Sequence, residues 1–298
     1  MNSTIPKTGE TRRLLPVACC IITYQPEKPI PDIVQNFLDI VERVYIIDNT
    51  PSEKLTIWQT TGKFQRKQNG KNTGIAAALN QALHRASQEG FRWLLTMDQD
   101  SEVDSVDLHR FLDAGISFMK STPSSALVSV SHEETRNRIN GITEKPFVMT
   151  SGNLVRVSHA IEAGGWKKRL FVDHVDHEFC LRLRNHGYSI WEAGDFSMKH
   201  NPGVRKRGET SPRLHRARRF YYMNRNLLWL QSVYGRDYVF ELRQLRTQHR
   251  RHIRTNLIHN PERVAVLFYT ISGLVIGLVW MLFPGRNASR RPSAPVSE

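Results

Sequence analysis

One apolar stretch of this sequence ends abruptly in two acidic residues, and it constrains the fold more than any other feature. Residues 93–97 read Trp-Leu-Leu-Thr-Met, and Asp98, Gln99 and Asp100 follow them directly. An apolar run of this length that stops at polar residues is typical of a buried parallel strand. In open α/β sheets, ligands bind outside the carboxyl ends of the strands. We therefore expect both carboxylates to lie at the edge of a binding crevice.

The spacing of Asp98 and Asp100 suits a hard divalent cation. Beyond the end of a strand, two acids one residue apart can face the same ion. Mg²⁺ or Mn²⁺ is usually held by one or two carboxylates together with substrate phosphates. A strand that runs into a solvated acidic turn has the same pattern, because Asp and Ser favour turns. The short motif alone leaves both interpretations open.

The first hundred residues alternate between strand-like and helix-like patterns. Strands are predicted at 14–24, 44–47, 65–69 and 92–97, and helices at 33–41 and from Gly74 to Gly90. This alternation indicates a doubly wound α/β sheet. A second acid, Asp48, ends the second strand, where an Asp–Asn turn before proline is the structural alternative. The loop before Gly74 opens a helix and can present backbone N–H groups to phosphate or ribose.

Residues 106–200 continue the α/β pattern and contain a second acidic cluster. Strands are predicted at 126–131, 147–157, 189–193 and 196–200, and helices at 106–119 and 175–187. Asp173, Asp176 and Glu178 gather at the start of the last helix, where the helix dipole also tolerates carboxylates without any catalytic role. His200 falls at the end of the last predicted strand, and Trp166 is either a core residue or an apolar platform for a sugar.

The C-terminal third is strongly basic. The chain carries a net charge of +14, and the segment from Arg205 to Arg254 contains 14 Lys and Arg residues but only three acidic residues. Such a block favours a polyanionic partner: nucleic acid, anionic lipid or pyrophosphate. Aromatic residues among the arginines could stack on bases; these are Phe220, Tyr221, Tyr222 and Trp229. A nucleic-acid role would leave the acids at the strand ends unexplained, and we expect no nucleic-acid partner.

Three regions are predicted: a loose tail at 1–13, a catalytic domain at 14–205 and a basic helical region at 206–298. The last contains residues 264–283, a run without a charged residue that is long enough to cross a bilayer. Arginines on both sides of this run and Gly and Ser within it favour a helix or helical hairpin that lies in the membrane interface. A single transmembrane span is the second interpretation, and a soluble core helix is the third. Three cysteines without a CxxC pair fit a reducing, cytoplasmic setting.

Several of these stretches together resemble family 2 glycosyltransferases, and most closely the bacterial rhamnosyltransferases of O-antigen and polysaccharide assembly. The resemblance covers about residues 15–285 and rests on VACCIITYQP, YIIDNTP, NTGIAAALNQAL, LLTMDQDS, SGNLVR, VDHVDHEFCLRLRNHGY and MKHNPG, in that order. It implies the GT-A nucleotide-sugar fold, a mixed sheet flanked by helices, here with a C-terminal helical extension that associates with the membrane.

The resemblance also implies roles for individual residues. Thr23, Tyr24 and Asp48 would line the nucleobase and ribose site, Asn72 and Gly74 would border ribose and pyrophosphate, and Asp98 would contact the donor. Asp100 and His200 would hold Mg²⁺ or Mn²⁺. Asp176 would be the catalytic base, with Asp173 as its rival, because valine replaces the acid that commonly precedes Asp176 in this family.

The implied reaction is an inverting, metal-dependent transfer of L-rhamnose from dTDP-L-rhamnose. The expected acceptor is a lipid-linked glycan or growing polysaccharide at the cytoplasmic face of the bacterial inner membrane, with an anionic membrane surface as partner and a homodimer left open. The alternative donor is a UDP-hexose or UDP-galactofuranose on the same fold. Arg205, Lys206 and Arg207 would fold over the diphosphate.

Overall fold

The computed structural model describes residues 14–52, 59–102, 104–132, 140–200 and 214–282. The tail 1–13, the loop 201–212 with Arg205, Lys206 and Arg207, and the boundary predicted at 205 lie outside these residues. The side chain of His200 is likewise not described. The three-region division therefore stays a prediction.

Nine strands form one mixed sheet in the order β3-β4-β2-β1-β5-β9-β7-β10-β8. They are β1 (Leu15–Thr23), β2 (Val41–Asp48), β3 (Gln59–Thr61), β4 (Phe64–Gln68), β5 (Trp93–Asp98), β7 (Ser125–Ser131), β8 (Ile142–Glu144), β9 (Asn153–Arg156) and β10 (Ser189–Ser197). β1, β2, β4 and β5 are parallel neighbours, as the alternating pattern predicts, whereas β9 runs antiparallel between β5 and β7. A separate two-stranded ribbon joins β6 (Ser101–Glu102) to β11 (Lys199–His200).

Helices cover both faces of the sheet. α1 (Ile30–Leu38) and α3 (Ser105–Ser121) pack on one face, and α2 (Ile75–Gln88), α4 (Val157–Glu162) and α5 (Val175–Asn185) on the other. Strand alternation explains the two cores: Cys20 of β1 belongs to the α2 side, and its neighbour Cys19 belongs to the α1 side. The predicted helix at 33–41 begins earlier, and the two strands predicted at 189–200 are one long strand, β10, followed by the short β11.

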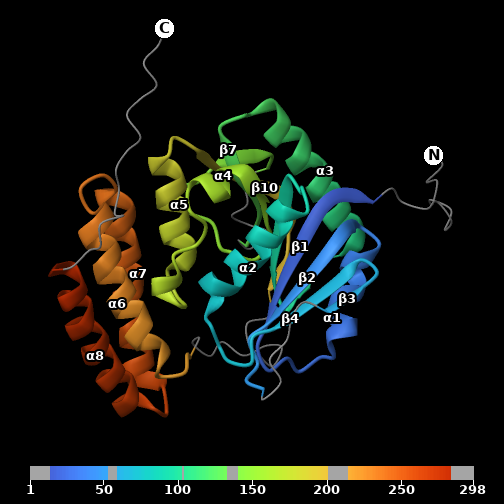
Figure 1. The fold of residues 1–298 in the computed structure, drawn as a ribbon. Coiled ribbons are helices and arrows are strands. Elements are labelled where there is room, and N and C mark those ends of the chain that lie inside the picture. Colours follow the sequence, from blue (N-terminus) through green and yellow to red (C-terminus); the bar gives the residue numbers. More distant parts are fainter. Residues whose placement is uncertain (1–13, 53–58, 103, 133–139, 201–213, 283–298) are drawn as a thin grey trace, which may run out of the picture.

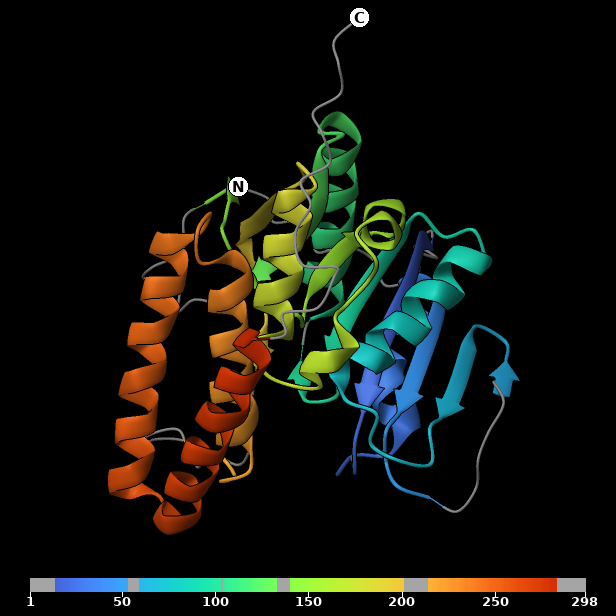
Figure 2. The same ribbon diagram turned by 60° about the vertical axis from the view of Figure 1, so that its left-hand side comes forward.

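Three long helices form a further layer beside α5. α6 (Arg219–Tyr234), α7 (Val239–His259) and α8 (Arg263–Leu282) stand together on the side of the molecule away from β3 and β4 (Figures 1 and 2). Leu227 and Leu230 of α6 and Leu242 and Leu245 of α7 extend the core that lies under α2 and α5. The last helices are therefore part of the fold that supports α5.

The layer rules out part of the nucleic-acid interpretation. Phe220 and Trp229 are buried in it, and Tyr221 and Tyr222 lie under the guanidinium of Arg225 at 5.2 and 5.0 Å from the two ring centroids. The two buried rings cannot stack on bases, and the guanidinium of Arg225 lies over each of the half-buried tyrosine rings. The aromatic residues between the arginines are packing residues of α6.

Candidate active site

The acid pair lies at the carboxyl end of β5, as its sequence pattern predicts. Asp98 is the last residue of that strand and is half-buried, and Asp100 is exposed just beyond it. The hydroxyl of Ser151 accepts a hydrogen bond from the backbone N–H of Asp98 at 3.0 Å and lies 2.7 Å from the hydroxyl of Ser101. The break in the 147–157 stretch thus fixes the backbone that carries both acids.

The residue between the acids links this motif to β1. The side-chain amide of Gln99 accepts from the N–H of Tyr24 at 2.7 Å and donates to the carbonyl of Tyr24 at 3.2 Å. This pairing holds the exit of β1, with Tyr24 38% exposed, next to the exit of β5. The neighbouring Thr23 is buried, and its hydroxyl has no partner within the described part of the chain. Gln99 was not singled out from the sequence.

Asp48 ends β2 and is fixed as a carboxylate. Arg66 donates to it at 2.5 Å, and the N–H of Thr50 donates at 2.9 Å. Burial raises the pKa of Asp48, but these hydrogen bonds outweigh burial and lower it below the ordinary value. A buried, ionised acid at a strand end suits a base or ribose contact. Arg66 is a neighbour that the sequence pattern did not reveal.

The loop that opens α2 is tied together by hydrogen bonds between its own side chains and the end of β2. Asn49 accepts hydrogen bonds from Asn69 at 2.9 Å and from the hydroxyl of Thr73 at 2.8 Å. The N–H of Gly74 donates to the side chain of Asn72, and Gly74 has a φ of 82°, which favours glycine. That N–H group is therefore already bonded within the loop. A role of Asn72 and Gly74 beside the pyrophosphate stays a prediction.

A side chain at Gly74 would also collide with the second acidic region. A Cβ there would lie 2.6 Å from both the ring and the carbonyl oxygen of Phe171, and that carbonyl accepts from the N–H of Ile75. Phe171, Asp173 and His174, just before α5, all have positive φ values although none is glycine. Strained backbone of this kind costs on the order of 1–3 kcal/mol per residue and clusters at functional sites.

Helix α6 holds this strained segment in place. The buried side chain of Asn226 donates to the carbonyls of Leu170, Val172 and Asp173 at 3.0, 2.8 and 2.8 Å. The neighbouring Arg225 donates to the carbonyl of Leu170 at 3.0 Å. Neither residue was singled out from the sequence, because nothing in the local pattern of α6 indicates a partner in another element.

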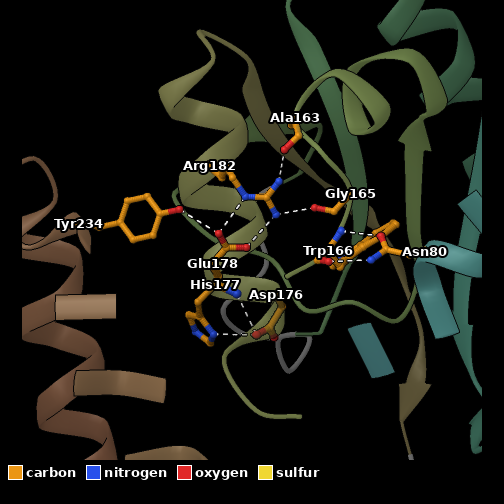
Figure 3. Close-up of polar contacts among 9 residues, drawn as sticks. All are labelled: Asn80, Ala163, Gly165, Trp166, Asp176, His177, Glu178, Arg182 and Tyr234. Carbon is orange, nitrogen blue, oxygen red and sulfur yellow. Dashed lines mark hydrogen bonds and ion pairs between the residues drawn. The ribbon is translucent and has the colours of Figure 1, made fainter. Parts of the chain in front are cut away.

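The two candidate bases have different surroundings. Both oxygens of Asp173 accept hydrogen bonds from the guanidinium of Arg219 at the start of α6. Asp176 instead accepts from the ring Nδ1 of His177 at 2.8 Å and from the backbone N–H of the same residue at 2.9 Å (Figure 3). Asp173 is therefore held in an ion pair with Arg219 of α6, whereas the partner of Asp176 is the titratable ring of His177.

His177 sets the charge of Asp176. Burial raises the pKa of Asp176, but the charge of His177 and its two hydrogen bonds more than offset burial, and the pKa falls from 3.8 to about 2. Burial lowers the pKa of His177, but the Asp176 carboxylate outweighs burial and raises it. The carboxylate is thus ionised at neutral pH and can accept a proton.

The remaining acid of the cluster is structural. Glu178 is fully buried and accepts from Arg182 and from the hydroxyl of Tyr234 at 2.9 Å (Figure 3). Arg182 also donates to the carbonyls of Ala163 and Gly165. Trp166 follows in the same loop and is buried against Phe179, which makes it a core residue and not a platform for a sugar.

The ribbon of β6 and β11 brings the predicted metal ligands into one region. His200 of β11 pairs with Ser101, the residue after Asp100. Within the described side chains, no three His, Cys, Asp or Glu groups form a ready-made metal site. Asp98 and Asp100 offer carboxylate oxygens at the end of β5, and oxygen ligands of this kind are those that Mg²⁺ or Mn²⁺ prefers. The metal-binding roles of Asp100 and His200 stay a prediction.

Comparisons with known proteins indicate the enzyme class and the fold. Residues 18–149 match the model of the family described as Glycosyl transferase family 2. The chain is a glycosyltransferase whose residues 18–149 match family 2. The matched residues include all the predicted donor-site residues from Thr23 to Asp100 and exclude Asp176 and His200.

Individual relatives of this glycosyltransferase extend the match. The dTDP-rhamnosyl transferase RfbF of Shigella flexneri is 28% identical over 235 residues, which cover 70% of this chain and 78% of that protein. S. aureus TarS in complex with UDP-GlcNAc superposes with a TM-score of 0.55 at 13% identity, covering 90% of this chain and 81% of that one. GalNAc-T7 with UDP, GalNAc and Mn²⁺ superposes with a TM-score of 0.54 at 10% identity, covering 83% of this chain and 58% of that one. These structures confirm the GT-A fold.

Proposed function

We propose that this glycosyltransferase moves a sugar from a nucleotide diphosphate to an acceptor hydroxyl in one inverting displacement, with Asp176 as the base. The observation that carries the proposal is that the Asp176 carboxylate lines an open pocket, whereas Arg219 binds both oxygens of Asp173. Asp176 takes the proton of the hydroxyl as its oxygen attacks the anomeric carbon. General-base help of this kind is worth about 10²–10⁴-fold in rate.

Asp100 and His200 would hold a divalent cation at the end of β5, with Asp98 in contact with the donor. When bound, Mg²⁺ or Mn²⁺ neutralises the negative charge of the departing diphosphate. Thr23, Tyr24 and Asp48 at the ends of β1 and β2 would bind the nucleoside. Gln99 and Ser151 keep the acid pair and the nucleoside site in register, because they bond to the backbone of Tyr24 and Asp98.

The donor we propose is dTDP-L-rhamnose, because the relative from Shigella flexneri is named as a dTDP-rhamnosyl transferase. The acceptor would be a lipid-linked glycan or a growing polysaccharide. UDP-hexose and UDP-galactofuranose are the competing donors on the same fold.

The test is a melting-temperature series in Mn²⁺ with dTDP-L-rhamnose, UDP-glucose and UDP-galactofuranose. A ligand at 100 times its Kd stabilises the folded state by about 2.7 kcal/mol. We expect dTDP-L-rhamnose to give the largest shift and Asp100→Ala to abolish it. A larger shift with a UDP-sugar would reassign the donor, and the absence of a shift with every sugar nucleotide would reject the proposal.

We further propose that α8 attaches the enzyme to an anionic bilayer at the cytoplasmic face of the bacterial inner membrane. Among the described residues, α8 is the one helix long and apolar enough to cross a membrane, which alone is weak evidence. Support comes from its two faces: Val266, Thr270, Gly273 and Gly277 are buried, whereas large apolar residues on the other side are exposed. The exposed arginines of α7 suit the anionic lipids of that leaflet.

A further inference from the structure

A pocket of about 250 Å³ lies between the start of α5 and one face of α7. Asp176 and His177 line one side, and residues 147–149, which precede β9, line another. The centroid of the Phe147 ring lies 4.9 Å from that of His177. The pocket thus contains the proposed base, an imidazole and an aromatic ring.

Helix α7 closes the pocket with four residues of a single face. Glu241, Gln244, Leu245 and Gln248 recur at the i, i+3, i+4 and i+7 spacing that places side chains on one side of a helix. Arg184 fixes Glu241 by an ion pair of 3.0 Å, and Leu245 is anchored in the core. Gln244 and Gln248 are exposed, and within the described part of the chain their amides have no hydrogen-bond partner.

Two unengaged amides beside apolar surface match the chemistry of a sugar ring. Each glutamine amide supplies two donors and an acceptor, which suits vicinal hydroxyls. The ring of Phe147 and the side chains of Met149 and Leu245 offer apolar surface to the C–H face of a pyranose. The volume lies below the about 300–1,000 Å³ of pockets for drug-sized ligands, so it suits one sugar ring and not a nucleotide.

The predicted donor-site residues lie elsewhere. None of Thr23, Asp48, Asn72, Asp98 and Asp100 lines the pocket. One short segment connects the two places: residues 147–149 line the pocket, and Ser151 bonds to the backbone of Asp98. A hydroxyl in the pocket can therefore reach Asp176, which a base must contact within about 2.6–3.2 Å or through one water.

We propose that this pocket binds the terminal sugar ring of the acceptor and that Gln244 and Gln248 of α7 determine which ring fits. This inference rests on the proposed glycosyl transfer and assigns the acceptor side of that reaction. It gives α7, which lies outside the residues matched by the family model, a direct part in recognition. Acceptor choice then resides in the C-terminal helices and donor choice in the first hundred residues.

The test uses the full-length enzyme, the donor that raises its melting temperature and a panel of octyl glycosides as acceptor probes. Gln248→Trp fills the pocket, and Thr247→Trp places the same ring on the adjacent, exposed position of α7, which does not line it. We expect Gln248→Trp to lose transfer and keep the donor Kd, and Thr247→Trp to behave as the wild type. The double variant Gln244→Ala/Gln248→Ala should raise the acceptor KM by about tenfold, the loss expected for one or two hydrogen bonds.

The outcomes separate the pocket assignment from the proposed function. A wild-type enzyme that binds the donor but glycosylates no octyl glycoside would overturn the pocket assignment. Equal transfer by the two tryptophan variants would do the same. If no sugar nucleotide binds the wild type, the proposed function itself fails. Melting temperatures of all variants without ligand show whether a loss of transfer reflects unfolding.

Discussion

The side-chain amide of Asn226 donates a hydrogen bond of 2.8 Å to the backbone carbonyl of Asp173, a residue 53 positions earlier in the chain. The contact joins α6 to the strained segment that leads into α5. The same amide also holds Leu170 and Val172. The geometry in front of Asp176 therefore depends on a helix of the C-terminal layer.

Replacing this amide should loosen the segment. Asn226→Ala removes a fully buried amide that donates to three carbonyls and accepts two hydrogen bonds from Arg225, and each hydrogen bond is worth about 1 kcal/mol net. We expect the free energy of unfolding to fall by about 3 kcal/mol or more and kcat to fall more than donor affinity. Denaturant unfolding and steady-state kinetics measure both. Gln231→Ala, on the same helix, is the control; an equal loss in the two variants would show that Asn226 has no special role.

The two acids before and within α5 should respond differently to the same substitution. Asp176→Asn removes the proposed proton acceptor, and we expect transfer to fall about 10²–10⁴-fold with the donor Kd unchanged. Asp173→Asn weakens the pair between the buried Asp173 side chain, 8% exposed, and the half-exposed Arg219, so the expected loss of stability is about 1–3 kcal/mol. Transfer rates, donor titrations and unfolding curves distinguish them. Full transfer by Asp176→Asn with loss in Asp173→Asn would assign the base to Asp173.

The Asp176–His177 pair should appear in the pH dependence. The pKa of Asp176 is about 2 in the folded chain and 3.8 ordinarily, so the ionised acid stabilises the fold above about pH 4 and loses this contribution as the pH falls towards 2. The pKa of His177 is raised in the folded chain above its ordinary value of 6.5. Protonated His177 therefore stabilises the fold below about pH 6.5, and this contribution is lost as the pH rises through the pKa that His177 has in the folded chain.

His177→Phe removes the partner that lowers the pKa of Asp176, while the burial that raises this pKa remains. The pKa of the acid should then rise above 3.8, and the acid limb of the transfer rate should move to higher pH. A pH–rate profile measures the limb, and acid unfolding measures the lost stability. The matched control is His84→Phe on the exposed side of α2. An unmoved acid limb in His177→Phe would show that His177 does not tune Asp176.

Some features of the site follow from local sequence and others do not. The apolar runs of β1, β2 and β5 stop at Thr23, Asp48 and Asp98, because the strands reach the polar edge of the sheet there, although Thr23 and Asp48 are themselves still buried. Contacts between residues of distant elements produce no pattern in the local sequence. For this reason Gln99 and Asn226 were missed. Trp166 could not be assigned from its sequence because its burial depends on Phe179 of another element.

The exposed face of α8 leads to the last prediction. Val264, Phe268, Ile271, Val275, Leu278 and Leu282 recur every three or four residues and are 53–78% exposed. On the opposite face, Gly273 and Gly277 let α6 approach so closely that a Cβ at Gly273 would lie 2.4 Å from the backbone of Tyr221. Because α6 carries the buried Asn226, a transmembrane α8 packed this way would draw polar groups of α6 into the bilayer. We therefore expect α8 to lie along the membrane surface.

Vesicle binding tests this orientation. Phe268→Glu/Val275→Glu removes two apolar side chains from the exposed face, each worth about 1.5–3 kcal/mol when buried, so binding to phosphatidylglycerol vesicles should weaken about 100-fold or more. Ser87→Glu/Gln88→Glu, two exposed changes on α2, adds the same charge without touching α8 and should bind as the wild type. Alkaline carbonate should release a surface-bound chain and retain a spanning one. If the α8 variant still binds vesicles but shifts from dimer to monomer, its apolar face pairs with a second copy of the chain instead.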